Sequence, residues 1–337
     1  MAKPKEGGGR KRYCCRCCCP VKGGCCWCCS AAAVLPLALV AFVLLVEKPV
    51  VEMVKPPGKE VLAHVAEEKL LPATSALAPA ANISFMFDRI AASYDSVNRG
   101  MSLGLDQHLR QILVQDCLRL QPGDHVLDLA TGTGAVALMA AAKLRELAKA
   151  AGSSGTVVGL DVSSEMLRQS ASKVKADALH EVLSLVRGDM QDMRNLHHTW
   201  LDSSAATSIE SESIDKISVA FGLRSLADRR RALREMRRVL RSRPGSRVCI
   251  LETVLPTDWI LPSHGAHRLV AYMVRLLTRL AIRGFGREAE RAALERSILG
   301  FPQPKEFATV LASEGLPVRT ITSFASGAVR LYEVAPA

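Results

Sequence analysis

Residues 124–134 read D-H-V-L-D-L-A-T-G-T-G and decide the fold. The first seven, Asp124–Ala130, read as a buried strand, with apolar residues on both sides of Asp128. The next four, Thr131–Gly134, form a glycine-rich turn, and an Ala-rich helix is predicted from Ala135 to about Ala150. A strand, a tight turn and a helix in direct succession are typical of the first unit of a βαβ sheet.

Apolar strands and amphipathic helices alternate along the rest of this region. Asp228–Arg241, for example, places its apolar residues on one helical stripe, and a helix is predicted to begin at Ser163 or Ser164. The further predicted strands are Thr156–Asp161, Val182–Arg187, Ile214–Ala220 and Arg247–Glu252. This alternation predicts an α/β domain with a mostly parallel sheet.

The glycine turn predicts where a ligand binds. Backbone N–H groups and the positive end of the helix dipole meet there, and Gly132 and Gly134 leave room for a ligand against the backbone. Asp161, at the end of the next predicted strand, could accept hydrogen bonds from both hydroxyls of a ribose. The pattern indicates a ligand that contains a nucleoside.

Two such ligands are a dinucleotide and S-adenosylmethionine. A dinucleotide turn prefers a third glycine where this chain has Ala137, although alanine is tolerated there. Asp128, within the first strand, could receive the ammonium group of a methionine moiety, and Asp189, after the third strand, suits the amino group of adenine. Acids at three successive strand ends favour S-adenosylmethionine, the alternative being that each acid caps a helix or a turn.

Composition divides the 337 residues into unlike parts. The formal net charge is +11, yet residues 1–46 hold seven Lys/Arg residues and one acid, so +6 of it lies there. Nine of the eleven cysteines lie between Cys14 and Cys29, which excludes a disulfide-stapled secreted fold. The remaining domain holds only Cys117 and Cys249, and we expect it to occupy a reducing interior. Its modest charge argues against a nucleic-acid partner.

Four segments are predicted: a basic Cys-rich tail at 1–30, an apolar segment at 31–46, a Pro/Ala-rich linker at 47–83 and a catalytic domain at 84–337. The apolar segment has 16 uncharged residues, which is borderline for a membrane span, so a membrane anchor and the h-region of a targeting signal both remain open. The cysteine cluster is compatible with acylation, with metal binding or with a poorly structured tail.

Several motifs resemble the UbiE-type quinone C-methyltransferases, and this resemblance runs from about Phe85 to Val334. It includes a cofactor loop at 126–134 and a following helix at 232–240. The most specific motifs are F-D-R-I-A with Y-D at residues 87–95 and F-G-L-R at residues 221–224.

The resemblance implies a Rossmann-like class I methyltransferase with a seven-stranded, mostly parallel sheet and helices on both faces. It implies that S-adenosylmethionine is contacted by Thr133, Asp161 and the Asp189-Met190 pair. Phe87, Asp88 and Tyr94 would lie in the segment that helps to close over the site. The implied reaction is C-methylation of a polyprenylated benzoquinol or naphthoquinol in ubiquinone or menaquinone biosynthesis.

Arg224 is the candidate catalytic residue. It lies just beyond the fourth predicted strand, where the substrate should meet the cofactor. A permanently charged arginine could stabilise the phenolate that makes a quinol ring nucleophilic. The alternative is a surface arginine that pairs with Asp228.

Departures from the family pattern keep a second function open. Ala135 and Ser225 replace an expected Asp and Asn, and two expected aromatics are Arg291 and Ala293, so a catalytically weak scaffold of a quinone-biosynthesis complex is the alternative. The pair His197-His198 lies in a Ser-rich insertion, and no metal site is predicted.

The predicted partners are a prenylated quinol, a membrane surface and other quinone-biosynthesis enzymes. The apolar, Arg-bearing stretch Trp259–Ile282 could be a helix that rests on an anionic membrane or one that packs on the sheet. The predicted location is the matrix face of the mitochondrial inner membrane, with a plastid as the alternative.

Overall fold

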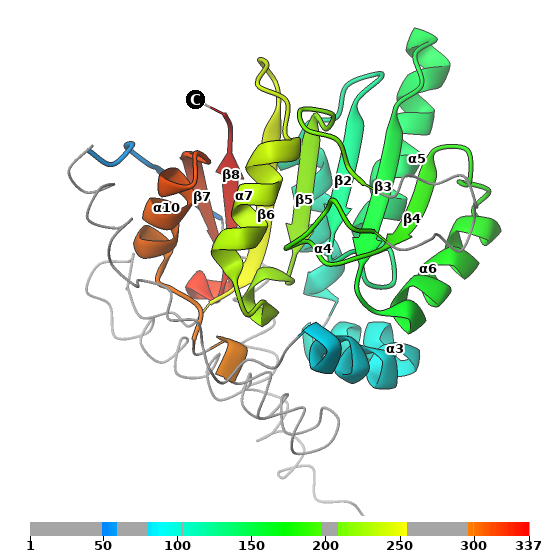
Figure 1. Ribbon diagram of the computed structural model, residues 1–337, viewed down its shortest axis with the longest axis horizontal. Coiled ribbons are helices and arrows are strands. Elements are labelled where there is room, and N and C mark those ends of the chain that lie inside the picture. The colour runs from blue at the N-terminus through cyan, green and yellow to red at the C-terminus, as the bar shows by residue number, and fades with distance from the viewer. Residues whose placement is uncertain are drawn as a thin grey trace, which may run out of the picture.

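The computed structural model describes residues 49–58, 80–102, 104–196, 208–254, 296–298 and 300–336. One eight-stranded sheet runs through this part of the chain in the order β1-β7-β8-β6-β5-β2-β3-β4 (Figure 1). The strands are β1 (Val50–Met53), β2 (His125–Leu129), β3 (Thr156–Asp161), β4 (Leu183–Arg187), β5 (Lys216–Ala220), β6 (Arg247–Thr253), β7 (Val318–Phe324) and β8 (Val329–Val334).

The centre of the sheet is parallel. Strands β6, β5, β2, β3 and β4 pair in parallel, whereas β8, β7 and β1 are antiparallel to their neighbours. The chain winds outward from β2 to β4 and then returns to start β5 on the other side of β2. Ligands of parallel α/β sheets bind at such a reversal, beyond the carboxyl ends of the strands.

Helices cover both faces of the sheet, as the sequence predicts. They are α3 (Ala80–Ser102), α4 (Leu105–Ile112), η1 (Leu113–Leu118, a π-helix), α5 (Ala135–Ala151), α6 (Ser164–Ala176), α7 (Arg229–Val239) and α10 (Pro304–Ser313), with short 3₁₀ turns η2 (Leu223–Ser225) and η3 (Ala325–Gly327). One apolar cluster joins α7 and α10 to one face, and a second joins η1, α5 and α6 to the other. The mostly parallel α/β fold is therefore confirmed.

The predicted elements match the observed ones to within a few residues. Strand β2 is buried along four of its five residues, Asp128 among them, because both of its faces are covered. Helix α6 begins after Ser163, whose hydroxyl accepts a hydrogen bond from the backbone N–H of Met166. Of the two residues proposed for this cap, Ser163 is the one that forms it.

The sheet has one strand more than the expected seven. Strand β1 lies in the range predicted as linker, where Val50–Met53 pairs antiparallel with β7. Its residues alternate between half-buried and exposed, as is typical of an edge strand. Four residues followed closely by Pro56 and Pro57 give a weak strand signal, which explains why the sequence did not predict a strand in this range.

Cys117 and Cys249 form a disulfide, a pairing that the sequence analysis, which expected the domain to occupy a reducing interior, did not predict. The bond joins η1 to β6 across 132 residues of sequence, and both cysteines are buried. The pair was not foreseeable from spacing, because only the packing of η1 against the sheet brings the two residues together.

Several predictions concern segments outside the described residues. These are the Cys-rich tail, the apolar segment 31–46, the pair His197-His198 and the stretch Trp259–Ile282. Among the helices that are described, none combines the length and the apolar character needed to cross a bilayer.

Candidate active site

The glycine turn after β2 lies at the reversal of the sheet. Gly132 and Gly134 have positive φ angles of 56° and 83°, and Ala130, just before them, also has a positive φ of 52°. A Cβ on Gly134 would come within 2.2 Å of the Ser170 hydroxyl oxygen on α6, so this glycine is required for packing. A Cβ on Gly132 would meet nothing nearer than 4.0 Å, so its side remains open to a ligand.

Asp161 connects the turn to the end of β3. Its carboxylate accepts hydrogen bonds from the backbone N–H of Gly132 at 2.7 Å and of Ser163 at 2.8 Å. Burial raises the pKa of Asp161 to about 6, against the lowering effect of these two bonds. Asp161 therefore caps the turn, as the alternative for this acid has it, and capping holds the carboxylate beside Gly132.

Asp128 is buried in β2, the strand that leads into the glycine turn. Its two carboxylate oxygens accept hydrogen bonds from the hydroxyls of Thr131 and Ser218, each at 2.7 Å. Burial raises the pKa of Asp128, and these hydroxyl bonds oppose the rise. The backbone N–H of Ala137 also bonds to this carboxylate, whose two oxygens offer about four lone pairs, so the side chain can still accept a hydrogen bond from an ammonium group.

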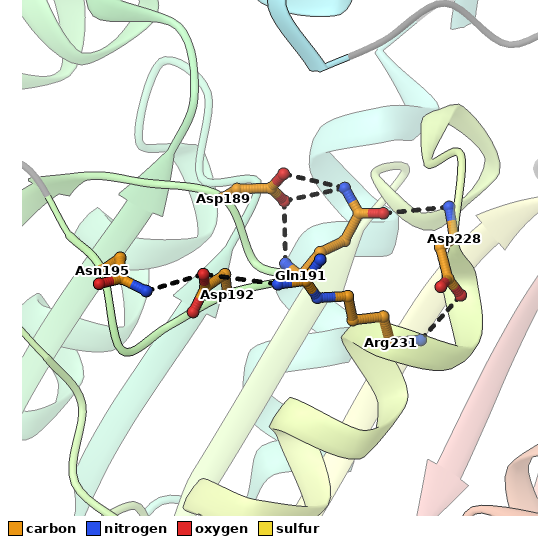
Figure 2. Close-up of a pocket in the computed structure, with 6 residues that line it drawn as sticks. All are labelled: Asp189, Gln191, Asp192, Asn195, Asp228 and Arg231. Atoms are coloured by element: carbon orange, nitrogen blue, oxygen red, sulfur yellow. Dashed lines mark hydrogen bonds and ion pairs between the residues drawn. The ribbon is translucent and has the colours of Figure 1, made fainter.

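Asp189 follows β4 and lines a pocket of about 340 Å³, which Figure 2 shows in close-up. Both of its carboxylate oxygens accept hydrogen bonds from the Gln191 side chain, whose Oε1 in turn accepts from the backbone N–H of Asp228. The pocket is lined by Asp189, Gln191, Asp192, Asn195, Asp228 and Arg231. Met190, next to Asp189, is buried in the apolar core. The structure thus brings Asp189 and Asp228 to one polar hollow.

Helix α3 lies beside α6 at the edge of the sheet that carries the glycine turn (Figure 1), and side-chain hydrogen bonds hold it there. Asp88 accepts from the Ser163 hydroxyl at 2.6 Å and from the backbone N–H of Glu165 at 3.0 Å. Asp95 accepts from the Thr133 hydroxyl at 2.7 Å and from Lys173 at 2.6 Å. Asp88 therefore joins α3 to the start of α6, and Asp95 joins α3 to the glycine turn.

Phe87 and Tyr94 form the apolar part of the same helix contact. Their rings meet edge to face with centroids 6.2 Å apart, and they pack around Ile90, Ala91 and Met166. This places the segment predicted to close over the site next to the glycine turn and the start of α6.

The F-G-L-R segment follows β5 with an unusual backbone. Phe221 has a positive φ of 62°, which bulky residues rarely adopt, and such backbone strain concentrates at functional sites. A Cβ on Gly222 would approach the Cβ of Ala130 to 2.6 Å, so glycine is needed for close packing of this segment against the end of β2.

Arg224 is buried rather than at the surface, and its ion-pair partner is not Asp228. Its Nη1 donates to Glu252 Oε1 at 2.6 Å and to the carbonyl of Phe221, while its backbone N–H donates to Glu252 Oε2 at 3.2 Å. Its Nε has no hydrogen-bond partner within the described residues. The alternative of a surface pair with Asp228 is wrong, and the Nε–H of Arg224 is a buried donor that no described residue uses.

Two residues of this site, Glu252 and Ser218, had not been singled out by sequence reasoning, and Asp95 had been noted only as part of the Y-D motif, with no role assigned to it. Glu252 lies at the carboxyl end of β6 and is fully buried, so the rule that picked out Asp161 could have found it. The partners of Asp95 and Ser218 lie 38 and 90 residues away in sequence, and no local pattern indicates them.

The residues present fit S-adenosylmethionine. Gly132 offers an open backbone, and Asp161 lies beside it to accept hydrogen bonds from a ribose. Asp128 is an acceptor for an ammonium group, and the Asp189 hollow is polar enough for the amino group of adenine. No cluster of three or more metal-ligating side chains exists in the part of the chain that the structure describes.

Comparison with known proteins identifies the family. The model of the ubiE/COQ5 methyltransferase family matches residues 77–334. The ubiquinone/menaquinone biosynthesis C-methyltransferase UbiE of Geotalea daltonii is 33% identical over 233 residues, which are 69% of this chain and 87% of that protein. The demethylmenaquinone methyltransferase of Thermus thermophilus is 34% identical over 237 residues, which are 69% of this chain and 92% of that protein.

Solved structures of similar shape are more distant in sequence. A SAM-dependent methyltransferase from Aquifex aeolicus is 15% identical with a TM-score of 0.44, over 68% of this chain and 89% of that one. A phosphoethanolamine N-methyltransferase from Haemonchus contortus, in complex with S-adenosyl-L-methionine, is 15% identical with a TM-score of 0.40, over 62% of this chain and 36% of that one.

The family match covers the described part of the chain from α3 to β8, including the glycine turn, the F-G-L-R segment and the strand that carries Glu252. The cofactor predicted from three strand-end acids is thereby confirmed. This chain belongs to the ubiE/COQ5 methyltransferase family and is an S-adenosylmethionine-dependent methyltransferase.

Proposed function

We propose that this enzyme methylates a ring carbon of a polyprenylated benzoquinol or naphthoquinol. The single observation that carries the proposal is the buried Arg224–Glu252 pair, which leaves Arg224 Nε as a donor at the cofactor edge. The printed functions of its relatives, in ubiquinone/menaquinone biosynthesis and demethylmenaquinone methylation, support the same reaction.

The chemistry needs a carbon nucleophile. A quinol ring becomes nucleophilic when one hydroxyl loses its proton, because the phenolate charge spreads onto ring carbons. S-adenosylmethionine supplies a methyl group that is already activated on a sulfonium. The protein must therefore hold the ring carbon in line with that methyl group and stabilise the phenolate.

Arg224 fits the second task. Its guanidinium stays protonated, and the bonds from Nη1 to Glu252 and to the Phe221 carbonyl fix its orientation. The unused Nε–H can donate to a phenolate oxygen in a site that excludes water, where such a bond is stronger than in bulk solvent. Because Glu252 neutralises much of the arginine charge, we assign Arg224 a directed hydrogen bond rather than the removal of the proton.

A prenylated substrate implies a membrane surface. The basic tail and the apolar segment 31–46 support membrane association, whether as an anchor or as a targeting signal. The proposed location is the matrix face of the mitochondrial inner membrane, with a plastid membrane as the alternative. Other quinone-biosynthesis enzymes are proposed partners because they make and consume the same lipid-tailed ring.

Complementation tests the proposal. The full chain, and a D161A variant as a cofactor-binding control, would be expressed in a bacterial strain that lacks its own quinone C-methyltransferase, and extracted quinones would be analysed by mass spectrometry. We expect the wild-type chain to restore a methylated benzoquinone or naphthoquinone and D161A to restore neither. Restoration of neither quinone by a wild-type chain found at normal abundance in the membrane fraction would refute the proposal and favour the scaffold.

A further inference from the structure

Arg110 on α4 is a buried arginine that no motif of the sequence analysis includes. Only 9% of its surface is exposed, and its Nε has no hydrogen-bond partner within the described residues. Buried guanidinium groups are normally satisfied by carboxylates or carbonyls, because an unpaired donor costs free energy. Arg110 therefore calls for a ligand-based explanation.

The surroundings of Arg110 all belong to the cofactor edge. Its guanidinium carbon lies 5.3 Å from the centroid of the Phe221 ring, the residue with the strained backbone after β5. Its charge also acts on two carboxylates. Burial raises the pKa of Asp128, and the Arg110 charge opposes that rise. Burial also acts to raise the pKa of Asp95, but Lys173, Thr133 and Arg110 together hold it below its usual value.

These neighbours place Arg110 beside both halves of the glycine-turn site. Asp128 lies in β2 directly before the turn, and Asp95 accepts a hydrogen bond from Thr133 within the turn. Arg110 on α4 and Asp128 on β2, a cation and an anion, are thus close enough for their charges to interact. The guanidinium lies within cation–π distance of the Phe221 ring, and its Nε–H remains available to an acceptor.

The methionine moiety of S-adenosylmethionine carries an ammonium and a carboxylate on one carbon. We propose that Arg110 binds the carboxylate of this moiety, while Asp128 receives the ammonium beside it. An arginine suits the first role because its planar donors match the two oxygens of a carboxylate. The inference depends on the cofactor of this family and not on the identity of the methyl acceptor.

A different anion, the phenolate of the acceptor, could in principle use the same donor. The cofactor carboxylate is favoured because the Arg110 charge acts on Asp128 and on Asp95, which accepts a hydrogen bond from Thr133 in the glycine turn, whereas the donor assigned to the phenolate belongs to Arg224 and is held by Glu252. Cofactor binding measured in the absence of any methyl acceptor distinguishes the cofactor carboxylate from the phenolate as the anion that Arg110 binds.

The test compares two ligands that differ only in the carboxylate. S-adenosylmethionine and decarboxylated S-adenosylmethionine would be titrated calorimetrically into the full chain, into R110M and R110K, and into R145M as a matched control. Arg145 lies on the exposed side of α5, where it bonds only to the carbonyls of Asp177 and Ala178. Circular dichroism would verify that each variant is folded.

We expect R110M to bind S-adenosylmethionine on the order of 10- to 100-fold more weakly than wild type, as for the loss of a charge-assisted hydrogen bond. Its affinity for the decarboxylated ligand should change less than about threefold on the same arithmetic, so the preference for the carboxylate disappears. R110K should recover part of the loss, and R145M should match wild type. An equal loss for both ligands, or an unchanged preference in R110M, would overturn the assignment.

Discussion

The Glu252→Gln substitution tests the ion pair that holds Arg224. The side chains of Arg224 and Glu252 are 10% and 0% exposed, so the substitution leaves a guanidinium buried without its counter-charge. Glutamine can still accept from Arg224 Nη1 and from the backbone N–H of Thr253, which both bond to Oε1. Its amide group, however, would face the backbone N–H of Arg224, where Glu252 Oε2 now accepts.

The expected loss follows from this geometry. Removing one partner of a buried pair costs about 3–5 kcal/mol, and we expect the lower end because one acceptor oxygen survives. For a domain of this size, each kcal/mol lowers Tm by about 2–4 °C, which predicts a decrease of at least about 6 °C.

Urea unfolding followed by circular dichroism measures the loss, with thermal unfolding as a second assay. E146Q is the matched control, because Glu146 pairs with Lys143 at the surface, where their side chains are 70% and 45% exposed. We expect E146Q to unfold at the wild-type midpoint. If E252Q and E146Q unfold at the same urea concentration, the burial argument for the Arg224–Glu252 pair is wrong.

Three further predictions concern the cofactor edge and the core. Because the pKa of Asp161 is raised to about 6, the affinity for S-adenosylhomocysteine should rise as the pH increases through 6 and the carboxylate ionises. The free energy of unfolding contributed by this group should fall as the pH rises from its unfolded pKa near 3.8 to about 6. Calorimetry from about pH 5 to 7.5 should show the change in affinity in wild type and not in D161N. Reduction of the Cys117–Cys249 bond should lower the free energy of unfolding by about 3–5 kcal/mol, since it closes a long loop, and equal urea midpoints with and without reductant would contradict this. Gly222→Ala should destabilise the protein by about 1–3 kcal/mol, because the new Cβ would overpack against Ala130. Gly100→Ala on α3, which has open space around it, should be neutral or stabilising. If Gly100→Ala unfolds at a lower temperature than Gly222→Ala, the close packing of Gly222 on Ala130 is refuted.

Local sequence signals predicted the parallel core of the fold well. The buried strand β2, the glycine turn after it and Asp161 at the end of β3 can each be recognised from neighbouring residues alone. The family resemblance added Arg224 and the α3 segment. These features lie where the structure places the cofactor edge.

Long-range packing explains what the sequence did not predict. Strand β1 has only four residues and owes its structure to pairing with β7, so its own residues give little signal. The Cys117–Cys249 bond depends on the way η1 packs on β6. Arg224 was predicted, but its partner Glu252 comes from a strand 28 residues further along the chain.

Methyl transfer in vitro tests the central claim most directly. Wild type, R224M and R224K would be supplied with methyl-labelled S-adenosylmethionine and a polyprenylated quinol in vesicles, with turnover, product position and S-adenosylhomocysteine affinity measured together. We predict a ring-carbon product for wild type, a loss of about 10²–10³-fold in kcat for R224M with cofactor affinity retained, and partial recovery in R224K. Turnover of R224M equal to wild type, or methylation of the quinol oxygen by wild type, would contradict the account.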